Sequence, residues 1–590
     1  MRRTAWFTLA VLLCMTVVSG GVVEQAAAGR VKLTFDHFYD HDAVVDALQQ
    51  LVKAYPEITG LESIGTSEEG RDIWVLTINN PKTGKDTDKP GIYVDGSIHG
   101  NEIQATEVCL YLAWYLLDSY ESNHVIKELV DSRAFYIVPI VNVDSRARFF
   151  VDPSSYQIGR TARVPYDDDR DGLFDEDDYD DLDGDGEILE MRVRDPAGGW
   201  KTHPDDPRVM VRVKPGEQGE WRRLGREGID NDGDHRLNED VPGYLDMNRN
   251  YGFKWQPPYV QRGAGDFPMS GKPTKAIADF VSSKPNIVFN YSFHNMGGLI
   301  VRGPSSKLSG VYSPSDVKVY DFLGKEAEKI IPGYQYIIAM KDLYTTYGDF
   351  DEYMFSCHGI YGFVGELFMS TQEHYRKPGE KPEGAEQQGG ERERRTYFSR
   401  TPQDEKHKFN DFVNQGRMFK DWEEFDHPQF GKIEIGGWRT FTTRIPPVFM
   451  LPEMVHRNAS LVIFTARHAP EIELEVLDVK ALGNGLHRIR VRVTNKNAIP
   501  TISAKALRHK IVREDILRIE GKGIEVVSGA IVEDPYLDRV VPVEHRPEMI
   551  FTHVPSFGSR DVQWVVKGAG AVKVIFDSRK AANRELNVKI

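Results

Sequence analysis

Cysteine is scarce in this chain. The 590 residues include three cysteines, Cys14, Cys109 and Cys357, whereas a fold stapled by disulfides carries an even set at close spacings. Cys14 lies within an apolar stretch at the N-terminus. Cys109 and Cys357 could form one disulfide in an oxidising compartment or remain as two buried thiols. In either case hydrophobic cores, and not cross-links, must supply most of the stability.

An excess of positive charge is also missing. The chain has 74 Lys and Arg against 89 Asp and Glu, a net charge of −15, so we expect no nucleic-acid partner. Beyond the N-terminus, no run approaches the roughly 20 apolar residues of a membrane helix. The remaining composition, 40% hydrophobic and 28% charged, is typical of a folded globular protein.

The first 28 residues predict a secretory signal peptide. A basic start is followed by an apolar run over residues 5–18 and then by small residues, which are the three parts of such a peptide. A membrane anchor is one alternative. Lipidation of Cys14 is another, although Leu13 stands where a small residue would be expected. We expect cleavage, no membrane contact afterwards, and a secreted protein that is extracellular or periplasmic.

Strands alternate with helices through the first two thirds of the chain. Helical spacing is found at residues 41–55 and 102–120, and strand-like runs at 60–65, 72–78, 91–95, 134–141, 287–293 and 360–365. Several of these runs are almost entirely apolar, as expected for strands that are covered on both faces. The alternation predicts an α/β fold with a mixed, largely parallel sheet flanked by helices.

Two stretches interrupt this pattern before a second domain begins. Residues 151–245 form a long acidic insertion, and residues 376–408 are polar enough to predict a flexible surface loop. A last helix near 453–467 would end the first domain, which covers residues 31–468. From 471 to 590, short alternating runs separated by turn residues predict an antiparallel β-sandwich domain of accessory role.

Chemically active residues follow three of the apolar strands. His99, His294 and Glu366 come at or just after strand ends, where open α/β sheets gather their functional groups. With Glu102, the two histidines would offer two imidazoles and a carboxylate to one zinc ion, leaving a position open for water, as in catalytic sites. Glu366 would then be free to act on that water. Taken singly, His99 could be a capping residue and Glu366 an ordinary ion-pair partner.

These motifs resemble the zinc metallocarboxypeptidases, the carboxypeptidase A-like family. The resemblance covers roughly residues 33–467 and suggests a bacterial-type secreted member with an acidic insertion and a C-terminal β-sandwich. It rests on Gly65-Thr-Ser-Glu-Glu-Gly-Arg-Asp-Ile, Gly-x-x-His99-Gly-Asn-Glu102, Asn142-Val-Asp144, Asp246-Met-Asn248-Arg249-Asn250-Tyr, Ser292-Phe-His294 and Gly365-Glu366-Leu. It implies hydrolysis of the last peptide bond of peptides or proteins with a free C-terminus, by a zinc-activated water with Glu366 as general base.

The resemblance also implies how a substrate is held. Asn248 and Arg249 would bind the free α-carboxylate, for which the planar fork of a guanidinium is well suited. Tyr344 matches the mobile tyrosine that closes over the bound C-terminus, with Tyr347 as a competitor. The alternatives are an interdomain salt bridge for Arg249 and a packed aromatic for Tyr344.

The resemblance also bears on the preferred last residue of the substrate. Asp351 falls near the position that separates carboxypeptidases acting on basic residues from others of the family. An acid at the base of the pocket would pair with a C-terminal Lys or Arg. Asp349 and Glu352 crowd beside it, so the sequence leaves open which acid faces the pocket.

Two departures from the family pattern affect arginines. The family stabilises the oxyanion with an arginine, but here Ser145 stands where a glycine is usual. The candidates for this catalytic role are Arg146, Arg148, Arg160 and Arg163, of which we favour Arg163 and then Arg160. Asn101 stands where the animal enzymes carry an arginine. The additional contact that this arginine makes with longer substrates is therefore in doubt here.

The acidic insertion suggests a second metal. Residues 167–190 hold 14 Asp and Glu against one Arg. Oxygen ligands at alternate positions followed by glycine resemble calcium-binding loops, although EF-hand spacing is absent. The predicted ligands are Asp167, Asp169, Asp171, Asp181, Asp183, Asp185, Glu190, Asp230, Asp232 and Asp234. We expect Ca²⁺ in a structural role; a solvated acidic loop is the alternative.

Two other functions remain open. The zinc chemistry could serve an amidase that acts on cell-wall peptides. The chain could instead be a calcium-dependent binding or adhesion protein whose peptidase domain is vestigial, although the complete set of active residues argues against that. The β-sandwich could contact a glycan or a protein.

Overall fold

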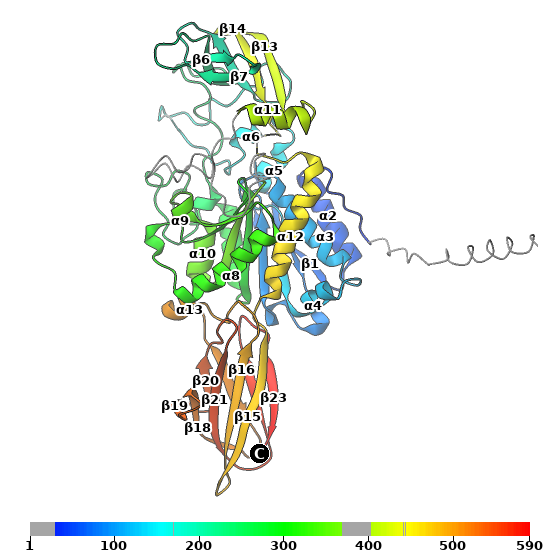
Figure 1. Cartoon of the computed structure of the whole chain (residues 1–590), viewed down its shortest axis with the longest axis vertical. Coiled ribbons are helices and arrows are strands. Elements are labelled where there is room, and N and C mark those ends of the chain that lie inside the picture. The colour runs from blue at the N-terminus through cyan, green and yellow to red at the C-terminus, as the bar shows by residue number, and fades with distance from the viewer. Residues whose placement is uncertain (1–29, 169, 369–402, 441, 443) are drawn as a thin grey trace, which may run out of the picture.

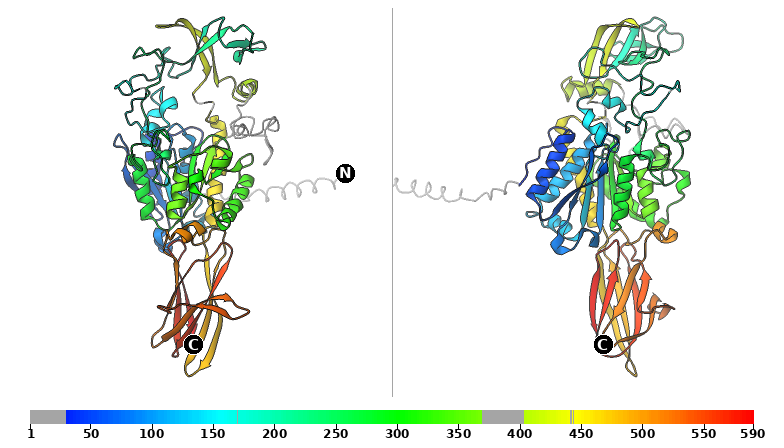
Figure 2. Two further views of the ribbon diagram at one scale, coloured as in Figure 1. Left: turned by 90° about the vertical axis from the view of Figure 1, so that its left-hand side faces the viewer. Right: turned by 180° about the vertical axis from the view of Figure 1, so that it is seen from behind.

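The protein has three parts stacked along its long axis (Figure 1), in a computed structural model that describes residues 30–168, 170–368, 403–440, 442 and 444–590. A central α/β domain carries a smaller sheet above it and a β-sandwich below it, in each view of Figure 2 as well. The predicted signal peptide lies outside the described residues. Within the residues described, no helix is long and apolar enough to cross a membrane.

The central sheet has eight strands in the order β1-β2-β4-β3-β9-β12-β10-β11. They are β1 (Thr59–Thr66), β2 (Asp72–Ile78), β3 (Gly91–Gly96), β4 (Ala134–Val138), β9 (Ile287–Asn295), β10 (Leu299–Arg302), β11 (Gln335–Ile338) and β12 (Tyr361–Leu367). The four middle strands β4, β3, β9 and β12 are parallel, whereas β1, β2 and β10 pair antiparallel with their neighbours towards the centre. The predicted mixed, largely parallel sheet is confirmed.

Helices cover both faces of this sheet. The α-helices among the described residues are α2 (His41–Ala54), α3 (Gln104–Asp118), α4 (His124–Ser132), α5 (Val143–Phe149), α6 (Ser155–Ile158), α7 (Lys272–Ser283), α8 (Pro314–Ile330), α9 (Ala339–Asp342), α10 (Phe350–His358), α11 (Gln403–Phe412), α12 (Leu451–Arg467) and α13 (Ala504–His509). Tyr93 of β3 contacts α7 and α10, while the hydroxyl of Tyr291 in β9 is 2.7 Å from that of Thr465 in α12. Neighbouring strands thus bury aromatic side chains on both faces, which explains their almost wholly apolar sequences.

Local signals in the sequence set several helix bounds. Asp40 caps α2 by accepting a hydrogen bond from the Ala43 amide, and Asn142 caps α5 through the Ser145 amide. Gly359 ends α10 in a left-handed conformation at φ 65°, which glycine adopts at low cost. The Asn142 cap matters for the site because it anchors the chain just beyond the sheet edge.

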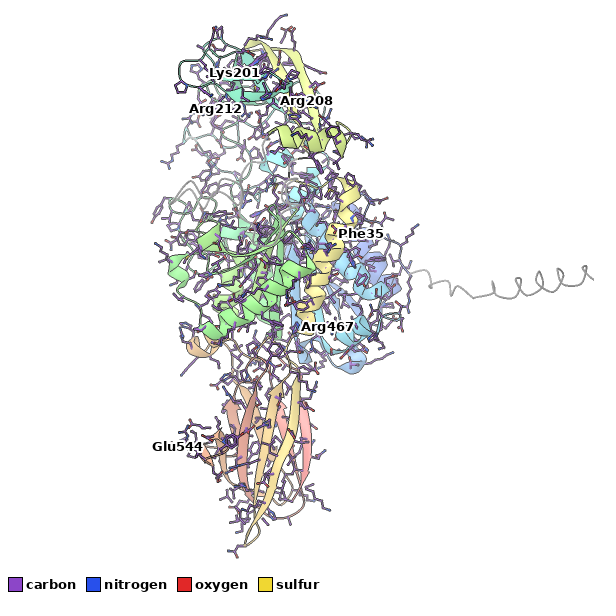
Figure 3. All side chains as sticks on the ribbon, viewed as in Figure 1. Phe35, Lys201, Arg208, Arg212, Arg467 and Glu544 are labelled. Carbon is purple, nitrogen blue, oxygen red and sulfur yellow. The ribbon has the colours of Figure 1, made fainter. Side chains whose placement is uncertain are left out.

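The acidic insertion contains a sheet that the sequence did not predict. Strands β5 (Glu190–Arg194), β6 (Trp200–His203), β7 (Asp206–Arg212) and β8 (Trp221–Arg226) join β13 (Phe419–His427) and β14 (Gly431–Trp438) in the order β13-β14-β5-β8-β6-β7. The Arg192 guanidinium lies 3.9 Å from the Trp221 ring and 4.0 Å from the Trp422 ring. Such cation–π stacking helps to hold a sheet whose strands are rich in charge. Figure 3 shows Lys201, Arg208 and Arg212 on this upper sheet.

The predicted surface loop over 376–408 is only partly within the structure. Its residues up to 402 lie outside the described residues. Residues 403–408 belong to α11, so the prediction of a loop is wrong for them. The His407 ring of α11 packs against Phe419 of β13 and Trp438 of β14, so this helix has contacts with the upper sheet, whose strands follow directly in sequence.

The C-terminal β-sandwich is confirmed. One sheet has the order β15-β16-β21-β18-β19 and the other β20-β17-β22-β23, with every pairing antiparallel. The strands are β15 (Ile472–Gly483), β16 (Leu486–Asn495), β17 (Asp515–Glu520), β18 (Glu525–Asp534), β19 (Arg539–Pro542), β20 (Met549–Thr552), β21 (Ser559–Lys567), β22 (Ala571–Asp577) and β23 (Arg584–Lys589). The sandwich docks on the central domain through Asp316 of α8, which accepts hydrogen bonds from the amides of Ala504 and Lys505. Cys109 and Cys357 are free thiols, so they form no disulfide.

Candidate metal centre and its pocket

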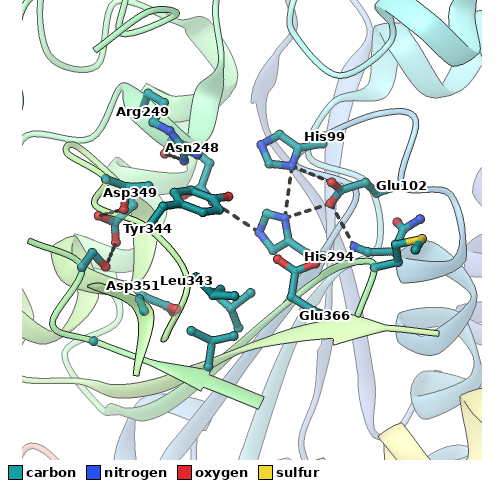
Figure 4. A pocket seen from close by; sticks show the side chains of 18 of the residues that line it. His99, Glu102, Asn248, Arg249, His294, Leu343, Tyr344, Asp349, Asp351 and Glu366 are labelled. Atoms are coloured by element: carbon teal, nitrogen blue, oxygen red, sulfur yellow. Dashed lines mark hydrogen bonds and ion pairs between the residues drawn. The ribbon is translucent and has the colours of Figure 1, made fainter. Parts of the chain in front are cut away.

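Three metal-ligand side chains meet at the carboxyl ends of β3 and β9 (Figure 4). His99 and Glu102 lie between β3 and α3, and His294 is the second-last residue of β9. The His294 Nδ1 atom is 3.1 Å from His99 Nδ1 and 2.9 Å from a Glu102 carboxylate oxygen. All three residues are 2% exposed. Parallel strands end at the same edge of a sheet, and this is why residues so far apart in sequence converge here.

The donor set fits a zinc ion. One ligand atom from each of His99, Glu102 and His294 lies within 4.8 Å of the others. Two imidazole nitrogens 3.1 Å apart direct their lone pairs at one another, which is unfavourable unless a cation or a proton lies between them. Two imidazoles and one carboxylate are ligands that zinc binds in catalytic sites.

Asp246 supports one of these ligands. Its carboxylate is 3.1 Å from His99 Nε2, so the ring can donate that proton and keep Nδ1 free for a metal. The Arg160 guanidinium lies 3.1 Å from the other oxygen of Asp246. Positive neighbours, chiefly Arg160 and then His99, outweigh burial and hold the pKa of Asp246 well below its usual range. We did not predict this role, although Asp246 stands in the quoted motif just before Asn248.

Glu366 lies in the same pocket without joining the three ligands. It is in β12, directly across the parallel ladder from His294, and it lines the pocket with the metal residues. Burial and the negative charge of Glu102 raise the pKa of Glu366 to about 7. A carboxyl group in this environment can both accept and return a proton near neutral pH.

The pocket extends from the metal ligands to Asn248 and Arg249 and has a volume of about 370 Å³. These two residues form part of a short 3-10 helix, η3 (Met247–Arg249), which Asp246 caps. The Asn248 side chain accepts a hydrogen bond from the Phe350 amide, and an Arg249 guanidinium nitrogen donates to the Asn248 carbonyl at 2.6 Å. Arg249 thus enters the pocket as a fixed, largely buried cation.

Tyr344 lines this pocket, and Tyr347 does not. Tyr344 follows α9 and is 49% exposed, as suits a side chain at the mouth of a cavity. The Tyr347 amide instead donates to the Gln261 side chain. The structure therefore favours Tyr344 over its competitor.

The arginine prediction needs a correction. Arg160 lines the pocket and is 3.4 Å from a Glu102 oxygen, whereas Arg163 pairs with Asp152 at 2.9 Å and does not line the pocket. An isolated bridge between Ala162 and Leu245 orients this segment. Our preference for Arg163 is therefore wrong, and Arg160 is the candidate.

The two remaining candidates are also engaged elsewhere. Arg146 is buried against Glu107 at 2.8 Å, and Arg148 pairs with Glu69 at 2.8 Å. Neither lines the pocket.

Two further arginines of the pocket were missed. The Arg444 guanidinium lies 3.3 Å from Glu102 and 3.0 Å from the Asn295 carbonyl oxygen, and Arg302 ends β10 at the pocket wall. Arg444 comes from the segment that follows the upper sheet, and no local pattern links it to the metal ligands. Asn101, where the family's extra arginine is absent, donates to the Tyr156 carbonyl instead.

Acidic residues line the far end of the pocket. Asp349 and Asp351 face it, whereas Glu352 does not line it and accepts a hydrogen bond from the Tyr312 hydroxyl. Asp351 accepts a hydrogen bond from the Asn290 side chain at 3.0 Å. Burial, above all, raises the pKa of Asp351 well above its usual range. A cation bound at this end would be paired with a carboxylate that otherwise lacks one.

The predicted calcium ligands behave differently from one another. Two of the three predicted triads are brought together: Asp181 with Asp183 and Asp185, and Asp230 with Asp232 and Asp234. Asp171 instead joins Glu176 and Asp232, while Asp167 accepts amide hydrogen bonds within its own turn. Asp169 lies outside the described residues.

Glu190 does not join an acidic cluster among the described residues. It is the first residue of β5 and pairs with Arg223 of β8, so the structure gives its prediction as a calcium ligand no support. Strand pairing within the insertion, which the sequence did not predict, decides its partner.

Comparison with known proteins places these residues among zinc carboxypeptidases. The family model for zinc carboxypeptidases matches residues 44–168 and 220–383, and a model for a domain of unknown function matches 471–589. Human carboxypeptidase D is 33% identical over 135 residues, which is 23% of this chain and 10% of that protein. A zinc carboxypeptidase of Saccharothrix mutabilis subsp. capreolus is 33% identical over 129 residues, 22% of this chain and 29% of that protein.

Two solved structures match part of the chain. Thrombin activatable fibrinolysis inhibitor matches 58% of this chain and 70% of its own, with 18% identity and a TM-score of 0.41. Carboxypeptidase A from Helicoverpa armigera matches 64% of this chain and 73% of its own, with 17% identity and a TM-score of 0.40. The chain spans less than a third of the length of the two curated relatives named above.

Proposed function

Because the chain belongs to the zinc carboxypeptidase family, we propose that it is a secreted metallocarboxypeptidase that removes the last residue of peptides or proteins. One observation carries this proposal. A zinc-type ligand set, a free carboxylate at Glu366 and the carboxylate-binding groups of Asn248 and Arg249 line one pocket. The zinc ligands alone would support many hydrolases, whereas a buried arginine beside them selects substrates with a free C-terminus.

His99, Glu102 and His294 are the residues that would hold zinc. When bound, zinc supplies Lewis acidity, which makes a water molecule more acidic and a peptide carbonyl more electrophilic. Asp246 orients the His99 ring for this purpose, because it is 3.1 Å from Nε2.

The chain's own residues account for binding and proton transfer. Arg249 and Asn248 bind the terminal carboxylate and so fix which peptide bond lies beside Glu366. Glu366 takes a proton from the attacking water as the new C–O bond forms, and gives it to the leaving nitrogen as the C–N bond breaks. Arg160 donates hydrogen bonds to the carbonyl oxygen that becomes negative. Tyr344 covers the bound residue and limits access of other water.

The acidic end of the pocket supports a preference for basic C-terminal residues. A terminal Lys or Arg would extend past Arg249 towards Asp349 and Asp351, which line that end. Its cation would offset the cost of ionising a carboxyl group whose pKa is raised by burial. We therefore propose Lys and Arg as the preferred last residues.

A peptide series tests the whole proposal. Peptides that differ only in their last residue should lose that residue alone, fastest for Lys or Arg, as measured by mass spectrometry of the products. Phenanthroline should abolish the activity and added zinc should restore it. Internal cleavage, or full activity in the chelated protein, would sink the mechanism. Equal rates for Lys, Leu and Glu would contradict only the role of Asp351.

The oxyanion role of Arg160 has a matched control nearby in the chain. Removing one donor from an oxyanion site typically lowers kcat by about 10²–10³-fold, and we expect a fall of that order for Arg160→Ala. Arg163→Ala removes an arginine whose partner is Asp152, and it should leave kcat within about twofold. Steady-state kinetics on one peptide would decide. Equal losses in the two variants would contradict the assignment.

The proposal includes a secreted location and calcium in the acidic insertion. The N-terminal sequence supports secretion, and calcium is abundant outside cells. A structural ion would offset the repulsion among the carboxylates of residues 167–190.

A further inference from the structure

The acidic insertion contains an internal repeat. Residues 167–177 read Asp-Asp-Asp-Arg-Asp-Gly-Leu-Phe-Asp-Glu-Asp, and residues 230–240 read Asp-Asn-Asp-Gly-Asp-His-Arg-Leu-Asn-Glu-Asp. Both have Asp at the first, third and fifth positions, Asp or Asn at the ninth, and Glu-Asp at the end. We call them the first and second repeats. Glu176 of the first is equivalent to Glu239 of the second, and Asp177 is equivalent to Asp240.

The last residues of the two repeats pair with each other. The Asp177 amide donates to the Asp240 carbonyl at 3.2 Å, and the Asn238 amide donates to the Asp177 side chain at 2.8 Å. The Asp168 amide in turn donates to the Asp240 side chain at 3.3 Å. Asp177 and Asp240 are 0% and 1% exposed. Each repeat thus buries its terminal aspartate against the other repeat.

Five carboxylate oxygens at this junction have no hydrogen-bond partner although they are buried. They are both oxygens of Glu176, both oxygens of Glu239 and Oδ2 of Asp240. An ionised carboxylate that is buried without a partner is strongly unfavourable. The two glutamates occupy equivalent positions of the repeats, so a glutamate without hydrogen-bond partners occurs once in each repeat.

The neighbours of these glutamates are themselves acids. Burial and the adjoining Asp240 raise the pKa of Glu176 to about 7, and Asp171 adds to this. Burial and the adjoining Asp177 raise the pKa of Glu239 to about 8, and Asp234 adds to this. The acids that act on the pKa of each glutamate thus include the terminal aspartate of the opposite repeat and the fifth residue of its own, and Asp171 and Glu176 have ligand atoms within 4.8 Å of each other. Such a pair of carboxylates needs a proton or a cation between its members.

In a third acidic loop of the insertion, a lysine side chain supplies the cation that neighbouring carboxylates require. Asp181, Asp183 and Asp185 also alternate along the chain, but Lys420 of β13 lies 2.6 Å from Asp183 and 2.7 Å from Asp185. The positive charge is supplied there by the protein. At the junction of the repeats, Asp234 has instead the exposed Arg236 beside it, at 3.5 Å.

We propose that two divalent cations bind between the repeats, each held by a glutamate of one repeat and the terminal aspartate of the other. The first site comprises Asp171, Glu176, Asp232 and Asp240, three of which already have ligand atoms within 4.8 Å of one another. The second comprises Asp177, Asp234 and Glu239. Sharing between repeats distinguishes these sites from loops that each bind an ion alone.

The ligand chemistry selects calcium. All the proposed ligands are carboxylates, which suit hard cations. Calcium accepts six to eight oxygen ligands in irregular geometry, whereas magnesium demands a strict octahedron and retains several waters. Zinc prefers nitrogen and sulfur ligands, and the one histidine of the repeats, His235, has a side chain that is 93% exposed.

The repeats lie on the two chain segments that reach the catalytic pocket. The Tyr166 and Tyr244 rings stack at 3.7 Å, and the Ala162 amide donates to the Leu245 carbonyl at 2.9 Å. One segment carries Arg160 and the other leads into Asn248 and Arg249. Two ions between the repeats would clamp these segments together. The effect on peptidase activity rests on the proposed function, but ion binding does not.

Calorimetric titration of the full chain with Ca²⁺, after treatment with EGTA, tests the sites. We expect two ions per wild-type chain and one in Glu176→Gln and in Glu239→Gln, because each variant loses one site. Glu217→Gln should keep two, since Glu217 lies outside both repeats and pairs with Lys201. Circular dichroism would establish that every variant is folded.

The change in Tm on adding Ca²⁺ gives a second test, because a folding defect alone would not remove this change. Calcium should raise the Tm of the wild type, while the double variant Glu176→Gln/Glu239→Gln should have the same Tm in Ca²⁺ and in EGTA. Because each change also removes a buried charge, its Tm in EGTA should be no lower than that of the wild type. No binding at millimolar Ca²⁺, or two ions still bound by the double variant, would overturn the sites. Peptide cleavage that persists in that case would leave the proposed function intact.

Discussion

Replacing Glu366 by Gln should lower kcat by about 10²–10⁴-fold, the contribution that a positioned general acid–base group makes. The amide has almost the same shape as the carboxylate but cannot take a proton from water. Substrate binding depends on Asn248 and Arg249 at the other side of the pocket, so KM should change little. The measurement is steady-state hydrolysis of one peptide by the variant and the wild type.

Controls separate this loss from misfolding and from loss of metal. Glu366 is not among the three residues whose ligand atoms converge, so the variant should contain as much zinc as the wild type. Glu453→Gln changes an exposed glutamate of α12 that pairs with Arg457, and it should retain full activity. A Glu366→Gln protein with wild-type kcat would remove the residue from the chemistry. A loss of bound zinc would show that it acts on the metal instead.

Arg249→Ala should lower kcat/KM by about 10²-fold, because a hydrogen-bonded ionic contact of roughly 3 kcal/mol is lost. Arg249 is 8% exposed and its guanidinium donates to the Asn248 carbonyl, so its charge is held in one place in the pocket. Arg249→Lys should recover only part of the loss, since an ammonium cannot bind a carboxylate through two parallel hydrogen bonds.

Amidated peptides complete this test as a double-mutant cycle. The wild type should cleave a peptide with a free C-terminus about 10²-fold faster than its amide, for the same energetic reason. The Arg249→Ala variant should hardly distinguish the two. Arg546→Ala, which removes an exposed arginine of the β-sandwich paired with Glu548, should behave as the wild type. If the variant still prefers the free acid by the full factor, another group binds the carboxylate.

Much of the site could be predicted because its residues follow strands. His99, His294 and Glu366 each stand at the end of an apolar run, and parallel strands place such ends along one edge of a sheet. Strand periodicity and the rule for that edge indicated where these residues gather, and the resemblance to the family supplied their roles. The β-sandwich was predictable for the same reason, since alternation at a period of two is a local property of the sequence.

The arginines could not be assigned in this way. Arg160 and Arg163 are alike in type and only a few residues apart, and the bridge from Ala162 to Leu245 decides which of them faces the metal ligands. Arg444 reaches Glu102 from the segment that follows the upper sheet. A sequence pattern describes neighbours along one segment, whereas these contacts depend on pairing between segments that are distant in the chain.

For the acidic insertion too, the sequence determined some features and the tertiary structure decided others. By itself, the sequence determined that carboxylates are concentrated in residues 167–190 and recur near 230, that the strand-end residues can bind zinc, and that two domains follow one another. Only the tertiary structure decided that Lys420 neutralises one acidic loop, that Arg223 takes Glu190, and that Glu176 and Glu239 remain without partners. The physical reason is that charge is a property of each residue, whereas its compensation depends on which other residues the fold brings within a few ångströms.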